Sequence, residues 1–326
     1  MDSGHFVISL DFELMWGVRD NRTKEDYGQN ILGAKFAINQ MLDVFEKNSV
    51  KATFAIVGFL FHKDKLNLLG SIPNHKPTYF EKKLSPYEDL GNLIGEDEND
   101  DPYYFGYSLV QKIKSKIIHE IATHTYCHYY CLEEGQTIEQ FEEDLKWAIS
   151  VAKLSDIEIK SIVFPRNQYN IEYLNVCKKL GIESFRGNER SLIYESTNGA
   201  EQTLFRRALR LIDSYINVTG YHCYSNEMMK ESTPFNIPSS RFLRPYSTKL
   251  AFIEQLKFLR IKNAMTYAAK NNLTYHLWWH PHNFGSNCVE NIMFLDRILK
   301  HYEFLNKEYD FQSITMKELS DKLNAN

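Results

Sequence analysis

Short apolar runs alternate along this 326-residue chain with longer segments in which apolar residues recur every three or four positions. A short apolar run is typical of a buried strand, and the longer spacing is typical of an amphipathic helix. Strand, helix and strand in this order predict a parallel pair of strands joined by a crossover helix. The alternation therefore predicts an α/β fold, and both an open doubly wound sheet and a barrel are consistent with it.

These spacings give the expected elements. Strands are predicted over residues 5–10, 52–57, 117–123, 161–164, 275–279 and 311–314. Helices are predicted over residues 33–47, 137–154, 171–180, 249–271, 288–306 and 316–323. Thr137 and Gln140 have the spacing of a capping box at a helix start. Two stretches rich in proline, about 62–106 and 186–248, lack either spacing and predict surface insertions in a single domain over residues 1–326.

Composition and charge exclude several classes of protein. The net charge is −4 at pH 7 and no basic stripe occurs, so we expect no nucleic-acid partner. The N-terminus lacks the basic and apolar regions of a secretory signal, and the longest apolar stretches, such as residues 54–61, are too short to cross a bilayer. Five cysteines at scattered positions do not form a disulfide framework. These features predict a cytoplasmic protein without a transmembrane segment.

Polar side chains directly follow four of the predicted strands. The clusters are Asp11-Phe12-Glu13, His124-Thr125-Tyr126-Cys127-His128, Pro165-Arg166-Asn167-Gln168 and His280-Pro281-His282. The carboxyl ends of parallel strands meet at one edge of a sheet, and the active sites of α/β proteins lie at that edge. We therefore expect the four clusters to form one site.

The first two clusters have the residue types of a metal site. His124 and His128 are four residues apart, a spacing that lets two imidazoles face one metal ion; two unrelated surface histidines are the alternative. Asp11 and Glu13 leave their strand on the same face. One of them could complete a site of two histidines and a carboxylate, and the other could act as a base. A strand-end turn is the alternative, but the apolar Phe12 beside the acids favours a buried, functional pair.

Arg166 and His280 are the remaining candidate catalytic residues. Arg166 follows a buried strand, where its charge needs a partner that Asp11 would provide; a surface arginine is the alternative. His280 also follows a strand and could act as a general acid, or it could be a core histidine with a hydrogen-bonded ring. His276 and His282 are candidates for supporting positions beside the site.

These motifs resemble those of the polysaccharide deacetylase family, the NodB-like carbohydrate esterases. Residues 120–128 resemble the family's metal-binding His-[Ser/Thr]-x-x-His motif, and residues 9–13 resemble its first motif, with Asp-x-Glu in place of Asp-Asp. Residues 164–168 resemble the arginine motif, with the arginine after its proline, and residues 277–281 resemble the late leucine-histidine motif. The fourth motif has no clear counterpart, and Asp213 is the candidate for it.

The resemblance implies a distorted (β/α)7 or (β/α)8 barrel. It also implies that Glu13, His124 and His128 hold one divalent metal ion, zinc in the first place, with cobalt, nickel or iron as alternatives. The catalytic residues that it implies are Asp11 as the base, Arg166 as the partner that orients it, and His280 as the acid.

The expected function is removal of an N-acyl group, acetyl in the first place, from a sugar that is a precursor of surface polysaccharide. That sugar could be nucleotide-linked, lipid-linked or part of an oligosaccharide. The candidate substrate-binding residues are Asn167, Gln168, Trp279 and Arg244. Further arginines of the second insertion could meet a phosphate or carboxylate, or form a solvated basic face; they are Arg206, Arg207, Arg210 and Arg241.

Several alternatives stay open. The chain could be a glycan-binding module without catalysis on the same fold, or a sugar deformylase. A magnesium-dependent phosphatase would share an opening such as Asp11-Phe12-Glu13, but the pair of histidines has no role in that mechanism. A binuclear metallohydrolase built on His280 and His282 would carry this His-x-His pair on its first strand rather than late in the chain.

Overall fold

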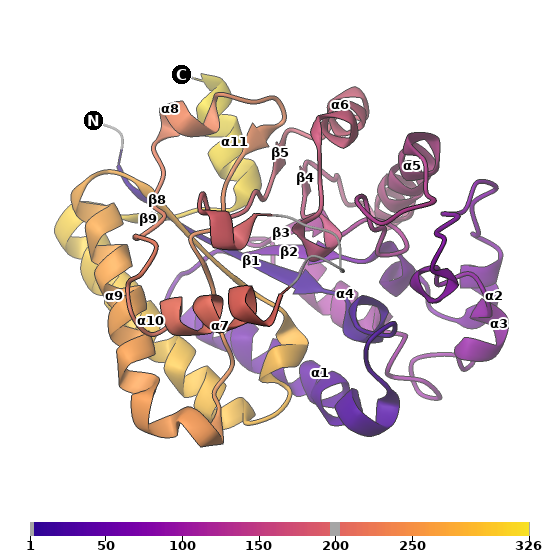
Figure 1. The fold of residues 1–326 in the computed structure, drawn as a ribbon, viewed down its shortest axis with the longest axis horizontal. Coiled ribbons are helices and arrows are strands. Elements are labelled where there is room, and N and C mark those ends of the chain that lie inside the picture. Colours follow the sequence, from indigo (N-terminus) through magenta and orange to yellow (C-terminus); the bar gives the residue numbers. More distant parts are fainter. Residues whose placement is uncertain (1–2, 196–202, 326) are drawn as a thin grey trace.

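Parallel strands curl into an incomplete barrel with helices around its outside (Figure 1). The computed structural model describes residues 3–195 and 203–325. The strands in these ranges are β1 (His5–Phe12), β2 (Thr53–Ile56), β3 (Glu120–Thr123), β4 (Ser161–Ile162), β5 (Ser184–Phe185), β6 (Phe235–Asn236), β7 (Arg241–Phe242), β8 (Thr274–Trp279) and β9 (Gln312–Ser313). They lie in the order β6-β5-β4-β3-β2-β1-β8-β7, and β9 pairs with the start of β1. The expected barrel of the (β/α) type is confirmed.

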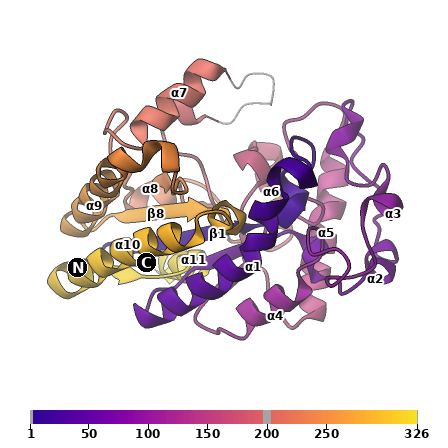
Figure 2. The same cartoon turned by 90° about the horizontal axis from the view of Figure 1, so that it is seen from below.

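The helices surround this sheet. They are α1 (Lys24–Lys47), α2 (Lys65–Leu69), α3 (Leu90–Leu93), α4 (Tyr107–Lys114), α5 (Ile138–Leu154), α6 (Ile171–Lys179), α7 (Leu204–Asp213), α8 (Asn226–Met229), α9 (Glu254–Lys270), α10 (Cys288–Tyr309) and α11 (Met316–Ala325). Figure 2 shows α1 and α7 on opposite sides of β8. None of the described helices is long and apolar enough to cross a membrane.

Several element boundaries differ from the predicted ones. Helix α1 begins at Lys24 rather than at residue 33, because Thr23 and Asp26 form a capping box there. Strand β3 begins at Glu120 rather than at residue 117, and the side chain of Ile117 is exposed. Helix α9 begins at Glu254, after a short 3-10 helix over Thr248–Ile253. The capping box of Thr137 and Gln140 is present, as its spacing predicts.

Part of the second expected insertion belongs to the sheet. Strands β6 and β7 lie within residues 186–248, at the two ends of the strand order. The backbone between them continues the pairing, since Ile237 N–H donates to the Phe185 carbonyl and Ser240 N–H donates to the His276 carbonyl. Two-residue strands produce no readable periodicity, so this contribution could not be seen in the sequence.

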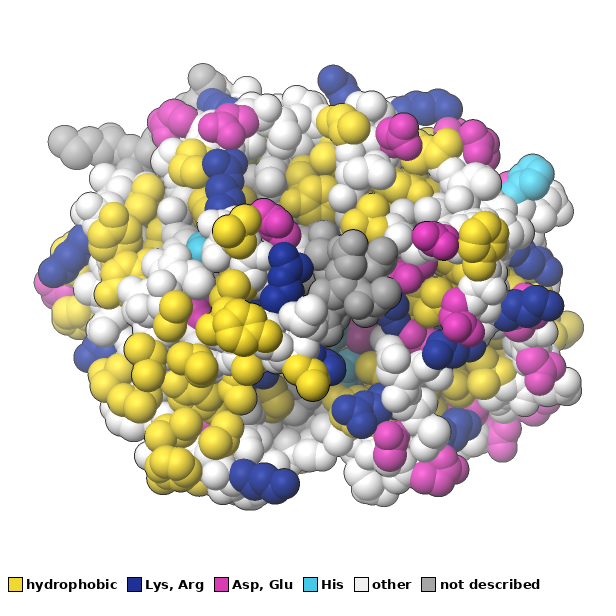
Figure 3. Space-filling model, viewed as in Figure 1, with side chains coloured by type: hydrophobic (Ala, Val, Ile, Leu, Met, Phe, Trp, Pro, Cys, Tyr) yellow, Lys and Arg dark blue, Asp and Glu magenta, His cyan; other side chains and the backbone are white. Residues whose placement is uncertain are grey.

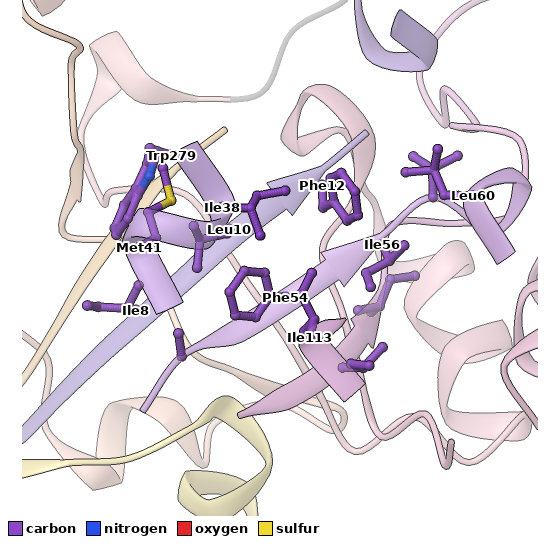
Figure 4. Close-up of a cluster of buried hydrophobic side chains, with 14 of the residues drawn as sticks. Ile8, Leu10, Phe12, Ile38, Met41, Phe54, Ile56, Leu60, Ile113 and Trp279 are labelled. Carbon is purple, nitrogen blue, oxygen red and sulfur yellow. The ribbon is translucent and has the colours of Figure 1, made fainter. Parts of the chain in front are cut away.

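Alternation along β1 separates the core from the site. Successive side chains of a strand point to opposite faces. Leu10 and Phe12 pack with the apolar side chains of α1 in one buried cluster (Figure 4). Ser9 and Asp11 point the other way, into the barrel, where both contact the guanidinium of Arg186. Alternate residues of β1 therefore belong to the core or are available for chemistry.

Helix α1 approaches the turn after β8 through two glycines. That turn is a 3-10 helix, η8 (Pro281–Phe284). A Cβ added to Gly33 would lie 2.2 Å from the Gly285 carbonyl oxygen, and one added to Gly285 would lie 1.9 Å from the Asn30 carbonyl oxygen. Both obstacles are backbone atoms, which cannot swing aside as a flexible side chain can. This contact fixes the turn that carries His282.

We expect Gly33→Ala to lower the free energy of unfolding by about 1–3 kcal/mol, because the added methyl forces α1 and η8 apart. Gly91→Ala in α3 is the matched control, since nothing lies within 4 Å of its added Cβ. That control should be neutral or stabilising by up to about 1 kcal/mol. Urea denaturation of both variants measures the difference, and equal unfolding free energies for the two would contradict the packing argument.

Candidate functional site

Three predicted site residues meet at the carboxyl ends of β1 and β3. Glu13 Oε2 lies 3.2 Å from His124 Nε2 and 3.0 Å from His128 Nε2. The candidate ligand atoms of the three residues all lie within 4.8 Å of one another, and all three side chains are buried. Two imidazole nitrogens and one carboxylate form a donor set that binds zinc and similar ions.

The tautomer of His124 and the burial of His128 suit metal binding. His124 Nδ1 lies 2.8 Å from the carbonyl oxygen of Val163. A carbonyl can only accept, so Nδ1 carries the proton and Nε2 presents its lone pair to the cluster. Burial lowers the pKa of His128 to about 4, so its imidazole is neutral at pH 7. A neutral imidazole is the form that binds a metal, and the residues present therefore fit a cation.

The histidines are presented by a tight loop rather than by a helix. Thr125 and His128 both have left-handed backbone conformations, with φ of 64° and 62°. Such conformations cost free energy in non-glycine residues and persist where the surroundings impose them. Here Asp144 of α5 accepts hydrogen bonds from the backbone N–H groups of Tyr126 (2.7 Å) and Cys127 (3.0 Å). Asp144 thus anchors the loop that holds both imidazoles.

Asp144 should give the stability of the protein a pH dependence. Burial raises its pKa from 3.8 to about 6. Because the folded pKa is the higher one, its stabilising contribution is complete below about pH 4 and is lost as the pH rises through 6. Relative to Asp144→Asn, the metal-free wild-type protein should therefore gain up to about 3 kcal/mol of unfolding free energy between pH 7 and pH 4. Urea denaturation across this range tests it; a difference between the two proteins that does not change with pH would contradict it.

Asp11 is held by a buried arginine. Arg186 follows β5, is fully buried, and donates from Nη1 to Asp11 Oδ1 and from Nη2 to Oδ2, both at 2.7 Å. The same guanidinium donates to Ser9 Oγ and Asn167 Oδ1 and lies 4.0 Å over the ring of Trp278. Burial raises the pKa of Asp11, but the adjacent positive charge outweighs this, and the net pKa lies below its ordinary value. Asp11 is therefore a fixed, ionised carboxylate.

The structure corrects the ion pair that we expected for Arg166. Its guanidinium binds Asp20 and, at 3.1 Å, Glu133 Oε1, whereas the partner of Asp11 is Arg186. Arg166 follows Pro165 in a left-handed backbone conformation, with φ of 54°, which turns its side chain toward the loops above the barrel. The position of Arg166 directly after a strand was therefore not enough to identify it as the partner of Asp11.

His280 lies beside the two carboxylates. Its Nε2 is 3.7 Å from Asp11 Oδ2 and 3.6 Å from Glu13 Oε1. Its Nδ1 lies 3.2 Å from Asn283 Oδ1, so Nδ1 donates there and Nε2 faces the site. The side chain is 24% exposed, which gives it access to substrate. His282 is buried and stacks on the His280 ring at 5.0 Å, which suits a supporting position.

A cavity of about 220 Å³ opens next to His280. Its wall includes Trp278 and the candidate substrate-binding residues Asn167 and Arg244. Arg166 also lines it, so that residue borders the cavity even though it does not contact Asp11. The arrangement offers a metal-ligand cluster, a fixed carboxylate and a partly exposed imidazole at one end of a cavity that could hold a small molecule.

Two other expected substrate contacts are corrected. Trp279 is fully buried in the core (Figure 4). It stacks on Phe284, and its neighbour Trp278 lines the cavity instead. The parity of β8 explains this, because adjacent residues of a strand face opposite sides. Gln168 is also fully buried, and its side chain accepts from Leu132 N–H and donates to Glu133. Gln168 therefore holds a loop rather than facing the cavity.

Asp213, the candidate for the missing fourth motif, lies in a separate ion-pair network. It binds Arg241 and lies 3.6 Å from an amino group of Arg260. Burial raises the pKa of Asp213, but the Arg241 charge outweighs this and the net pKa lies well below its ordinary value. Among the residues that the structure describes, the hydrogen-bond and ion-pair partners of Asp213 do not include Glu13, His124 or His128. Asp213 thus anchors the end of α7.

The comparisons with known proteins concern the family and the fold. The model of the polysaccharide deacetylase family matches residues 26–185, which include His124 and His128 but neither Asp11 nor Arg186. The sequence has no match among the curated proteins.

Solved structures with a similar fold cover nearly all of the chain. One is described as a polysaccharide deacetylase from Mycobacterium smegmatis; it has a TM-score of 0.61 and 11% identity, over 99% of this chain and 92% of its own. Another, described as a polysaccharide deacetylase from Pseudomonas aeruginosa, has a TM-score of 0.56 and 9% identity, over 98% and 91%. An allantoinase, Puue, has a TM-score of 0.52 and 10% identity, over 98% and 90%. At these identities the likeness shows the fold alone.

Proposed function

Because residues 26–185 of this chain belong to the polysaccharide deacetylase family, we propose that the protein is a metal-dependent hydrolase that removes an N-acyl group from a sugar. The observation that supports this most directly is the buried cluster of Glu13, His124 and His128 beside Asp11 and His280. A purely structural cluster would not need a partly exposed imidazole beside a cavity.

The side chains divide the reaction between them. Glu13, His124 and His128 hold the metal ion, for which we propose zinc. When bound, the ion supplies Lewis acidity, which activates water at neutral pH and stabilises negative charge on the attacked carbonyl oxygen.

The two groups beside the cluster move protons. Asp11 is the base that accepts a proton from the attacking water, and Arg186 keeps Asp11 ionised and oriented through two hydrogen bonds. His280 donates a proton from Nε2 to the departing amine, and its bond to Asn283 fixes the ring for that role. An amine leaves poorly without this proton, so the acid is as necessary as the base.

We propose that Arg244 contacts an anionic group of the substrate. Its half-buried guanidinium lines the cavity near two other arginines, Arg210 and Arg241, and burial lowers its pKa. Within residues 3–195 and 203–325, no ion pair joins Arg244 to a carboxylate. A desolvated arginine without a counter-ion suits a phosphate, as in a nucleotide-linked or lipid-linked sugar precursor of surface polysaccharide.

Removing this charge should affect one substrate class selectively. We expect Arg244→Gln to raise KM for an N-acyl sugar phosphate by about 10–100-fold, with little change for the unphosphorylated sugar, because a charge-assisted hydrogen bond is lost. Arg297→Gln is the matched control, since it removes an equal charge from an exposed side chain on α10. Steady-state kinetics on both sugars measures the effect, and an equal rise in KM for both would remove the phosphate contact.

The function is tested by metal analysis together with product analysis. Purified protein is loaded with zinc, and acetate and formate release is measured on neutral, nucleotide-linked and lipid-linked N-acyl sugars. Acetate release that disappears with a chelator and returns with metal supports the proposal. Formate release instead identifies a sugar deformylase. Stoichiometric metal with sugar binding but no acyl release on any of these substrates would favour the glycan-binding alternative.

A further inference from the structure

Helix α7 is amphipathic in the opposite sense to a normal surface helix. Three of its four charged side chains face the protein: Arg206 and Arg210 donate to the carbonyl oxygens of Leu192 and Ile193, and Asp213 is fully buried against Arg241, whereas Arg207 is exposed. Its apolar side chains face outward. A surface helix of a soluble protein ordinarily buries its apolar stripe and exposes its charges.

The exposed apolar side chains continue from α7 onto α9. Six of them, on α7, the residues after it, the 3-10 helix before α9 and α9 itself, form what we call the α7–α9 surface: Leu204 (81%), Phe205 (71%), Ile212 (48%), Ile216 (58%), Phe252 (82%) and Leu256 (44%). The two segments are joined by contacts of Asp213 with Arg260 and of Tyr215 with Glu254. Figure 3 shows hydrophobic side chains gathered over the region where Figure 1 places α7 and α9. A patch of this kind marks an interaction site rather than scattered surface residues.

The exposed charges on the two segments that carry this surface have one sign. The acidic residues of segments 203–218 and 248–263 are Asp213 and Glu254, and both are buried in ion pairs. The exposed charged side chains of the same segments are Arg207, Lys249 and Lys262. Exposed apolar side chains accompanied by three exposed cations, with no exposed acid in the described residues of these segments, complement the surface of an anionic membrane.

We propose that the α7–α9 surface docks on an anionic lipid bilayer, with Leu204, Phe205 and Phe252 inserted at the boundary between headgroups and acyl chains. The inner face of α7 contributes Arg210 to the cavity wall, and Ser214 follows it there. One helix therefore faces the membrane on its outer side and the cavity on its inner side. This inference goes beyond the proposed chemistry and does not depend on it.

Co-sedimentation of the full chain with vesicles tests this docking. Vesicles of phosphatidylcholine with phosphatidylglycerol are compared with vesicles of phosphatidylcholine alone. We expect the wild-type protein to bind the anionic vesicles, and Leu204→Ser combined with Phe205→Ser to weaken binding by about tenfold or more, because two inserted side chains are lost. The matched control is Ile117→Ser with Leu154→Ser, which removes two equally exposed apolar side chains outside this surface.

Each other outcome overturns the proposal. Equal loss of binding in the control variant would show non-specific adsorption. Absence of vesicle binding, with self-association that the Leu204→Ser and Phe205→Ser variant abolishes, would show that a second copy of the chain covers this surface. A monomer that binds neither vesicle would leave the surface without a membrane role. None of these readouts requires metal or turnover, so failure here is distinct from failure of the deacetylase assay.

Discussion

Substituting His128 with alanine should abolish metal binding and acyl release together. The substitution leaves Glu13 and His124 as two ligands, where the wild-type cluster has three with atoms within 4.8 Å. Catalytic zinc sites are ordinarily built from three protein ligands, so occupancy at limiting metal should fall to background. Metal analysis of the purified variant and acetate release under the same conditions measure the two effects.

The informative comparison for this variant is Asp11→Asn. Asp11 is not part of the ligand cluster, so this protein should keep its metal while kcat falls by about 10²–10⁴-fold, the usual contribution of a general base. Together, His128→Ala and Asp11→Asn distinguish the residues that bind the metal ion from the residue that accepts the proton. Undiminished turnover by a metal-free His128→Ala protein would refute the proposed mechanism, and loss of metal from Asp11→Asn would place Asp11 among the ligands.

The sequence was sufficient where long strands end in polar residues. Strand β1 has eight residues and β8 has six, so their apolar runs are visible and the clusters after them could be placed at one edge of a parallel sheet. The same reasoning placed His124 and His128 at one site with the Asp11 and Glu13 pair, and the family resemblance then assigned Glu13 as the carboxylate ligand. Their pairing across more than 100 residues of chain follows from sheet order alone, because β1, β2 and β3 are neighbours.

The sequence could not predict the direction of a side chain where that direction depends on a short strand or on tertiary contacts. Arg186 follows a strand just as Arg166 does, but β5 has only two residues and produces no apolar run. Trp278 and Trp279 are both aromatic, so composition could not show which of them faces the cavity; only the register of β8 against β1, with Trp278 opposite Ser9, decides it. The outward orientation of the apolar face of α7 could likewise be seen only from its tertiary contacts. Periodicity shows that a helix has an apolar face, but not whether that face points toward the protein or away from it.

Removing the Arg186 guanidinium is the second substitution with a large expected effect. Arg186→Met leaves Asp11 ionised and buried without a counter-ion, and breaking a buried pair in this way costs about 3–5 kcal/mol of unfolding free energy. The kcat should also fall by at least about 10²-fold, because the base loses both bonds that orient it. Urea denaturation of metal-free protein and steady-state kinetics measure the two quantities.

Two controls distinguish this role from a general loss of stability. Arg190→Met removes an exposed pair with Glu231 and should change the unfolding free energy by less than about 1 kcal/mol. In the double variant Arg186→Met with Asp11→Asn, no buried charge is left uncompensated, so part of the lost stability should return while activity stays absent. If the two single effects on stability simply add, the buried pair is not coupled. In that case Arg186 would not be the group that orients the base.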